Sequence, residues 1–188
     1  LQNQMLLSEH WEITAGLRSD NYNDFGHALA PRMALVWKPA TKRSVKLMYG
    51  SAFRAPNFLE LYDKNNYVDF GNRNLQEENV ETLELAFVQT AENYHAELTL
   101  FNNNFNDLIQ LSDPVEDVNN PFFAPSFTNV DQVKSRGAEL DLNFRITSEF
   151  SVSGNYTWFT QSSAINVPRQ LATVIVNYQL GAWHINSH

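Results

Sequence analysis

Cysteine is absent from the 188 residues, which excludes disulfide bonds, thiolate metal sites and a cysteine nucleophile. Charged residues are also scarce at 18%, and no run of Lys or Arg offsets the net charge of −8. That acidic balance argues against a nucleic-acid partner, which would need a basic surface. No apolar run approaches the roughly 20 residues of a membrane-spanning helix, so any membrane crossing would be made by β-strands.

Aromatic residues, by contrast, are abundant at 13%, and apolar residues alternate with polar ones along most of the chain. Trp11 and Ile13 alternate with Glu12 and Thr14, a period of two that indicates a strand with one apolar face. A solvated sheet surface would explain any single strand of this kind, but not its repetition. The pattern predicts ten strands, at 2–7, 11–22, 28–38, 44–53, 80–90, 94–111, 128–146, 150–161, 169–179 and from 183 onward.

The links between these strands alternate strictly between two lengths. Short links are expected at Ser8–His10, Pro39–Arg43, Ala91–Asn93, Thr147–Glu149 and Leu180–Ala182, and longer or more polar ones at 23–27, 54–79, 112–127 and 162–168. Short turns at one end and long loops at the other are typical of bacterial outer-membrane barrels. We therefore predict an all-β fold, an antiparallel up-and-down transmembrane β-barrel segment, located in the outer membrane of a Gram-negative bacterium with the lipid bilayer as a partner.

Aromatic residues also gather beside the short links, where a membrane interface selects rings with one polar edge. Ordinary strand propensity is the alternative explanation for them. The residues concerned are Trp11, Trp37, Tyr94, Phe144, Phe150, Tyr178 and Trp183.

The decapeptide Phe53–Tyr62, FRAPNFLELY, closes a predicted strand and opens the longest predicted loop, in which 57–62 could form one helical turn. It is similar to the F-R-A-P…E-L-Y element of TonB-dependent outer-membrane receptors. Six further segments resemble motifs of that family in the same order: Gly16–Asp20 (G-x-R-x-D), Pro31-Arg32 (S-P-R), Gly71–Glu78 (G-N-P-x-L-x-P-E), Asp107–Ile109 (D-L-I), Asn129 with Gly137–Glu139 (N…G-x-E), and Pro168. Alanine precedes Pro31, and Arg73 and Glu77 replace two prolines, which suggests a less rigid loop.

The resemblance covers about residues 4 to 180 and points to the C-terminal part of the receptor barrel. It implies about ten strands of a larger barrel of the 22-stranded plugged type. Such receptors import a ferric siderophore, haem or a cobalamin, so the expected ligand is a metal chelate or similar small molecule. The energy would come through TonB, acting on a plug domain that we expect to lie outside residues 1–188. The residues that carry the family motifs are Phe53, Arg54, Pro56, Glu60, Tyr62, Gly71, Asn72, Gly137 and Glu139.

The first residues, LQNQMLLSEHWEI, lack the basic and apolar regions of a signal peptide, and the chain stops within a predicted strand. We therefore expect residues 1–188 to be part of a longer protein.

Arg54 is expected to pair with a carboxylate on the lumen side, such as Glu60 or Glu78, rather than to contact ligand. Ligand contact is instead expected in the two long loops, where aromatic rings could stack on a planar ligand and Arg73 or Lys64 could meet an anion. Packing of the loops on themselves is the alternative. The candidates are Tyr62, Tyr67, Asp69, Phe70, Arg73, Phe122, Phe123 and Phe127.

Catalysis, a resident metal and a cofactor are not expected. His184 and His188 share a strand face but lie roughly 13 Å apart by strand rise, too far to share one ion. The carboxylates of Glu77-Glu78 and of 113–117 lie in polar loops without a nearby nucleophile. Two other functions stay open: a passive porin-like barrel, and an adhesin or ligand-binding β-domain without a transport role.

Overall fold

The structure is a computed structural model that describes residues 1–22, 26–64, 68–117, 120–162, 168–181 and 183–187. Its main feature is a ten-stranded sheet. The strands are β1 (Gln2–Ser8), β2 (Trp11–Tyr22), β3 (Gly26–Ala40), β4 (Arg43–Arg54), β5 (Glu78–Thr90), β6 (Tyr94–Leu111), β9 (Phe127–Arg145), β10 (Phe150–Ser162), β11 (Gln170–Leu180) and β12 (Trp183–Ser187). All ten predicted strands are confirmed in order, with small shifts at their ends.

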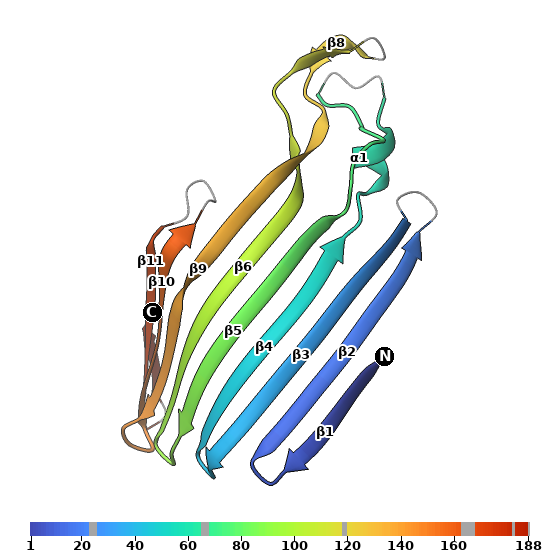
Figure 1. The fold of residues 1–188 in the computed structure, drawn as a ribbon. Helices are drawn as coiled ribbons and strands as arrows, with labels where there is room; N and C mark the ends of the chain where they lie inside the picture. Colours follow the sequence, from blue (N-terminus) through green and yellow to red (C-terminus); the bar gives the residue numbers. More distant parts are fainter. Residues whose placement is uncertain (23–25, 65–67, 118–119, 163–167, 182, 188) are drawn as a thin grey trace.

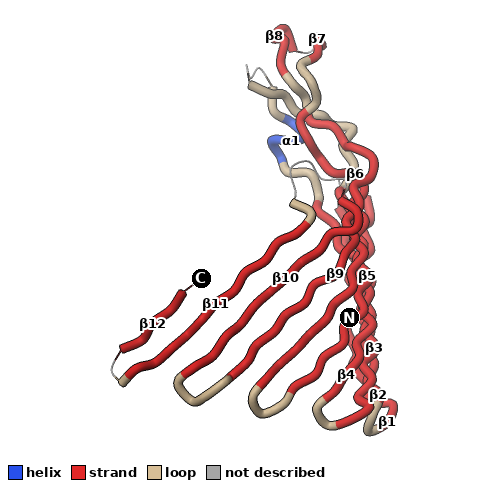
Figure 2. The backbone as a smooth tube through the Cα atoms, turned by 90° about the vertical axis from the view of Figure 1, so that its left-hand side faces the viewer, coloured by secondary structure: helices blue, strands red, loops and turns tan. Residues whose placement is uncertain are grey.

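All neighbouring strands of the sheet pair antiparallel, and they follow one another in the chain except at one place. There β6 pairs directly with β9, because the intervening β7 (Val115–Asp117) and β8 (Asn120–Ala124) form a separate hairpin. The sheet is strongly tilted and curls like a trough, as Figures 1 and 2 show from two directions. Within the described residues no ladder joins β1 to β12, so the sheet does not close on itself. This is the up-and-down topology of a barrel wall, present here as an open segment.

The register of the sheet separates an apolar face from a polar one. One laterally paired row crosses six strands on the apolar face: Ile13, Leu35, Leu47, Leu85, Leu100 and Ala138. The opposite face carries charged side chains, including Lys46, whose Nζ lies 3.8 Å from Glu97, and Glu139, which accepts a hydrogen bond from Asn155. Many large apolar side chains remain exposed on the first face, as expected of a surface that lipid rather than protein covers.

Short turns lie at the lower end of the sheet in Figure 1. Aromatic rings meet in pairs on the strands next to these turns. Trp11 stacks on Trp37 with centroids 5.8 Å apart. The ring centroids of Tyr94 and Phe144 lie 6.2 Å apart, and those of Phe150 and Tyr178 lie 6.0 Å apart. Neighbouring strands therefore present their rings at one level, as an interfacial girdle requires. In the turn between β9 and β10, hydroxyls of Ser148 and Thr147 donate to Glu149 and lower its pKa.

The opposite end of the sheet carries the long connections (Figure 1). The predicted helical turn is confirmed as α1 (Phe58–Tyr62), which follows β4. Two short strands, β7 (Val115–Asp117) and β8 (Asn120–Ala124), form a separate hairpin between β6 and β9, where the sequence predicted only a loop. No helix among the described residues is long and apolar enough to span a bilayer.

Candidate functional site

The helix α1 begins at a complete capping box. The side chain of Asn57 accepts a hydrogen bond from the backbone N–H of Glu60 at 2.9 Å, and the Glu60 carboxylate accepts one from the N–H of Asn57 at 2.8 Å. Reciprocal bonds of this kind satisfy two backbone donors that the start of a helix leaves unpaired. Pro56 is buried just before the N-cap residue Asn57 and fixes the direction in which the chain leaves β4.

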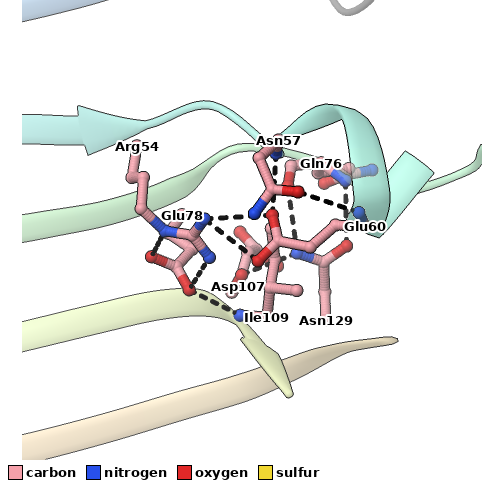
Figure 3. Close-up of polar contacts among 8 residues, drawn as sticks. All are labelled: Arg54, Asn57, Glu60, Gln76, Glu78, Asp107, Ile109 and Asn129. Atoms are coloured by element: carbon pink, nitrogen blue, oxygen red, sulfur yellow. Dashed lines mark hydrogen bonds and ion pairs between the residues drawn. The ribbon is translucent and has the colours of Figure 1, made fainter. Parts of the chain in front are cut away.

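Arg54 connects this helix to the sheet, as Figure 3 shows. Its Nε and Nη2 donate to the two oxygens of Glu78 on β5 at 2.6 and 2.8 Å. Its Nη1 lies 3.0 and 3.1 Å from the two oxygens of Glu60, whose residue is only 8% exposed. One planar guanidinium thus holds two carboxylates from different elements. The predicted pairing of Arg54 is confirmed, and it involves both glutamates rather than one.

Two further contacts extend this network to β6 and β9. A Glu78 oxygen accepts a hydrogen bond from the backbone N–H of Ile109 at 2.8 Å. The side chain of Asn129 on β9 bonds both backbone groups of Gln76, at 2.9 and 3.1 Å, and donates to the carbonyl of Asp107 at 2.6 Å (Figure 3). Asp107 has a φ of 55°, and it interrupts the otherwise regular pairing of β6 with β9. The Asn129 amide therefore holds a left-handed kink in place.

The two long loops pack together above this network, and we call this unit the cap, comprising α1 and the described residues of 63–77 and 112–126. The N–H of Phe70 donates to the carbonyl of Pro125 at 3.1 Å, and Asn72 Nδ2 donates to the carbonyl of Phe127 at 2.9 Å. The cap has a small apolar core, in which each residue is at most 8% exposed: Leu61, Phe70, Leu75 and Ala124.

Gly71 lies where the loop passes closest to α1. A Cβ at this position would lie 2.6 Å from the backbone nitrogens of both Tyr62 and Asp63. The N–H of Gly71 donates to the carbonyl of Asp63 at 2.9 Å, and that of Asn72 donates to the carbonyl of Glu60 at 2.7 Å. The glycine of the G-N motif therefore permits a close approach that any side chain would prevent.

Two other motif positions also have a packing role. A Cβ on Gly137 would lie 2.2 Å from the carbonyl oxygen of Trp158, beside the edge contact of Phe101 with Phe159. The pairing of β9 with β10 shifts register next to this point. Phe53 contacts Tyr22 edge-on at 6.1 Å and lies under the guanidinium of Arg18 at 5.4 Å.

Among the predicted ligand-contact residues, Tyr62 and Arg73 lie together. The guanidinium of Arg73 is 5.0 Å from the centroid of the Tyr62 ring, and Phe58 contacts the same ring at 5.1 Å. Phe58 is 73% exposed and was not identified from the sequence. Its position, one helical turn before Tyr62, was the available signal.

The other candidates are more scattered. Phe123 is 70% exposed on β8, Asp69 and Phe127 are half-buried, and Phe70 is buried in the cap. Tyr67 and the side chain of Phe122 lie outside the described part of the chain. In the residues described, no three His, Asp or Glu side chains lie close enough to hold a metal ion.

Asn129 is the main site residue whose role the sequence did not reveal. It was recognised only as part of a motif, because its partner Gln76 is 53 positions away. Only the pairing of β6 with β9 brings them together.

An open wall with one apolar face, aromatic turn ends and an elaborated opposite end defines the class of outer-membrane β-barrels. Residues 1–187 match the family model "TonB dependent receptor-like, beta-barrel". The chain belongs to this family and is located in the outer membrane. The predicted family and location are confirmed.

Individual relatives agree with this assignment. The iron-regulated outer membrane virulence protein of Vibrio cholerae serotype O1 is 26% identical over a 208-residue alignment covering 97% of this chain and 32% of the relative. The vitamin B12 transporter BtuB of the same species is 30% identical over 112 residues, covering 60% of this chain and 18% of its own length. The siderophore receptor PirA of Pseudomonas aeruginosa shares the fold, with a TM-score of 0.82 at 22% identity, covering 98% of this chain and 35% of the receptor. The chain thus spans about a third or less of these relatives.

Proposed function

We propose that residues 1–188 form part of the barrel wall of an outer-membrane active transporter that imports a ferric siderophore, haem or a cobalamin-type ligand. The membership of the chain in the TonB-dependent receptor family supports this function. We further propose that a plug domain outside these residues fills the lumen and receives energy from TonB. The names of the relatives, one iron-regulated and one a B12 transporter, favour a scarce metal complex as the ligand.

Ligand contact is assigned to the exposed side of the cap. The observation that carries this assignment is the cluster of Arg73, Tyr62 and Phe58, in which a cation lies over one ring and a second ring adjoins it. The edge of the guanidinium can still donate hydrogen bonds to an anion while its face covers Tyr62. Phe123 adds a second exposed ring on β8. Tyr67, Asp69, Phe122 and Phe127 remain candidates in the same loops, whereas the buried Phe70 would act by supporting them.

Calorimetry on the complete receptor with a panel of iron and cobalt chelates tests this proposal. For the chelate that binds, Arg73→Gln should weaken binding by about tenfold, as expected for one lost charged hydrogen bond. Arg145→Gln, at the end of β9 near the short turns, is the matched control and should leave affinity unchanged. Equal affinities for both variants and the unmodified receptor would refute the assigned contact.

The two alternatives predict different behaviour. A passive porin-like barrel would admit the chelate without TonB, so uptake that persists in a TonB-deficient strain would favour it. An adhesin or soluble binding domain would not need detergent and would not show heat-modifiable migration. The active-transport proposal requires both TonB dependence and partitioning into detergent micelles.

A further inference from the structure

The apolar face changes abruptly to a polar one on three neighbouring strands, toward the end that carries the cap. On β5, Leu83 is followed on the same face by Glu81; on β6, Leu100 by Asn102. On β9, Ala138 is followed by Arg136. The strands continue to pair regularly beyond this change, as far as Asn106 with Gln132. These side chains thus form a polar tier on the wall itself: Glu81, Asn102, Gln132, Lys134 and Arg136.

An interfacial aromatic marks the level of this tier. Trp158 on β10 pairs with Ala138, the residue directly below Arg136 on the same face, and is 48% exposed. Tyr49 on β4 pairs with Leu83, and its hydroxyl donates a hydrogen bond to the Glu81 carboxylate at 3.0 Å. Trp and Tyr with an apolar body and a polar edge settle where hydrocarbon meets headgroups. The polar tier therefore lies at the height of the headgroups of the outer leaflet.

Among the described residues, the two cations of the tier have no carboxylate partner. Arg136 is exposed, and its Nε donates to the neutral amide of Asn102 at 2.5 Å. Lys134 is half-buried beside Asn104. No ion pair found in the described parts of the chain involves either residue. Glu81, the carboxylate of this tier, lies two strands from Lys134 and is bonded to Tyr49.

We propose that Lys134 and Arg136 bind the phosphate of a phosphorylated glycolipid in the outer leaflet. Alternate residues on one strand face lie about 7 Å apart, so two cations there can flank one headgroup phosphate. A guanidinium fits phosphate oxygens with paired hydrogen bonds, and an ammonium adds a point charge. The adjoining amides of Asn102 and Gln132 match the hydroxyls of a sugar. The site is on the outside of the wall and is independent of which solute the lumen carries.

Native mass spectrometry of the complete receptor tests the proposal, using vesicles of phosphatidylcholine with or without a bis-phosphorylated glycolipid. The unmodified receptor should retain the glycolipid through detergent extraction. Lys134→Gln with Arg136→Gln should retain about thirtyfold less, from the contribution expected of two interfacial cations. The control variant Lys42→Gln with Arg43→Gln removes the same charge from two exposed residues, the last of the turn and the first of β4, and should retain as much glycolipid as the unmodified protein.

Two further measurements distinguish binding of a lipid phosphate from binding of the sugar alone and of free phosphate. The unmodified receptor should retain a dephosphorylated glycolipid as poorly as the Lys134 and Arg136 double variant retains the intact one, because the phosphates are gone. Inorganic phosphate at millimolar concentration should not displace the intact glycolipid, whose acyl chains add to the binding. Equal retention by both double variants, or complete displacement by inorganic phosphate, would overturn the proposal. Heat-modifiable migration of each variant checks that it has folded.

Discussion

Arg54 is the residue on which the attachment of α1 to the sheet most depends, because its guanidinium bridges Glu60 on α1 and Glu78 on β5. Replacing Arg54 with glutamine removes the charge and leaves the buried Glu60 carboxylate without its cation. We expect local opening to become easier by about 1–3 kcal/mol. Faster hydrogen–deuterium exchange at the amides of Leu61 and Asp63, measured on the complete receptor, would report it.

The comparison variant for this prediction is Arg18→Gln. Arg18 is paired with Asp20, but its side chain is 69% exposed, so the expected change is below about 1 kcal/mol. If both variants exchanged at the unmodified rate around α1, the bridging role of Arg54 would be wrong.

Gly71 makes a second prediction at the residue scale. Gly71→Ala would place a methyl group 2.6 Å from backbone nitrogens of α1, and the loop would have to move away. We expect a loss of about 1–3 kcal/mol, the usual cost of overpacking, seen as faster proteolysis within 63–77. Gly50→Ala is the matched control, since nothing lies within 4 Å of its added methyl. Cleavage at equal rates in the two variants would argue against the close approach.

Among the elements, β6 and β9 contact the cap through the side chain of Asn129, in addition to the bond that Asn72 donates to Phe127. Asn129→Ala removes three hydrogen bonds at once, to Gln76 and Asp107. We expect a cost of about 2–3 kcal/mol from the backbone groups left unpaired. Exchange should accelerate together at 75–77 and 107–109. The control Asn143→Ala removes one hydrogen bond to Asp141 and should leave exchange in both segments unchanged. Unchanged exchange in Asn129→Ala as well would show that its bonds to Gln76 and Asp107 do not stabilise the cap.

The sequence predicted the elements better than it predicted their connections. Period-two alternation identified every strand of the main sheet because successive side chains point to opposite faces, and along most of each strand these faces meet different surroundings. The pairing of Arg54 was predictable because Glu60 is six positions away and belongs to the same motif. The hairpin of β7 and β8 was missed because its strands are short, Pro114 directly precedes β7 and Pro121 lies within β8, and prolines are turn and loop signals.

For the whole molecule, the division between the two faces predicts how it tolerates charge. Leu98 lies on the apolar face and Thr99, its neighbour on β6, lies on the polar one. Leu98→Lys should destabilise the complete receptor in the membrane by about 2–4 kcal/mol, the cost of a lysine near the midplane. Thr99→Lys should cost much less, because that face meets water and polar groups. Heat-modifiable migration across a urea series measures both; equal midpoints would mean that the faces are assigned wrongly.

The open space around Gly50 makes the wall accessible to spectroscopy. Because these 188 residues contain no cysteine, Gly50→Cys would introduce one thiol that can carry a spin label or fluorophore. The label would stand on the polar face, in the row of Arg32 and Thr82, without displacing a neighbour. The mobility of the label would change whenever something filled or left the space beside the polar face, giving a direct reporter of occupancy for testing the proposed transport.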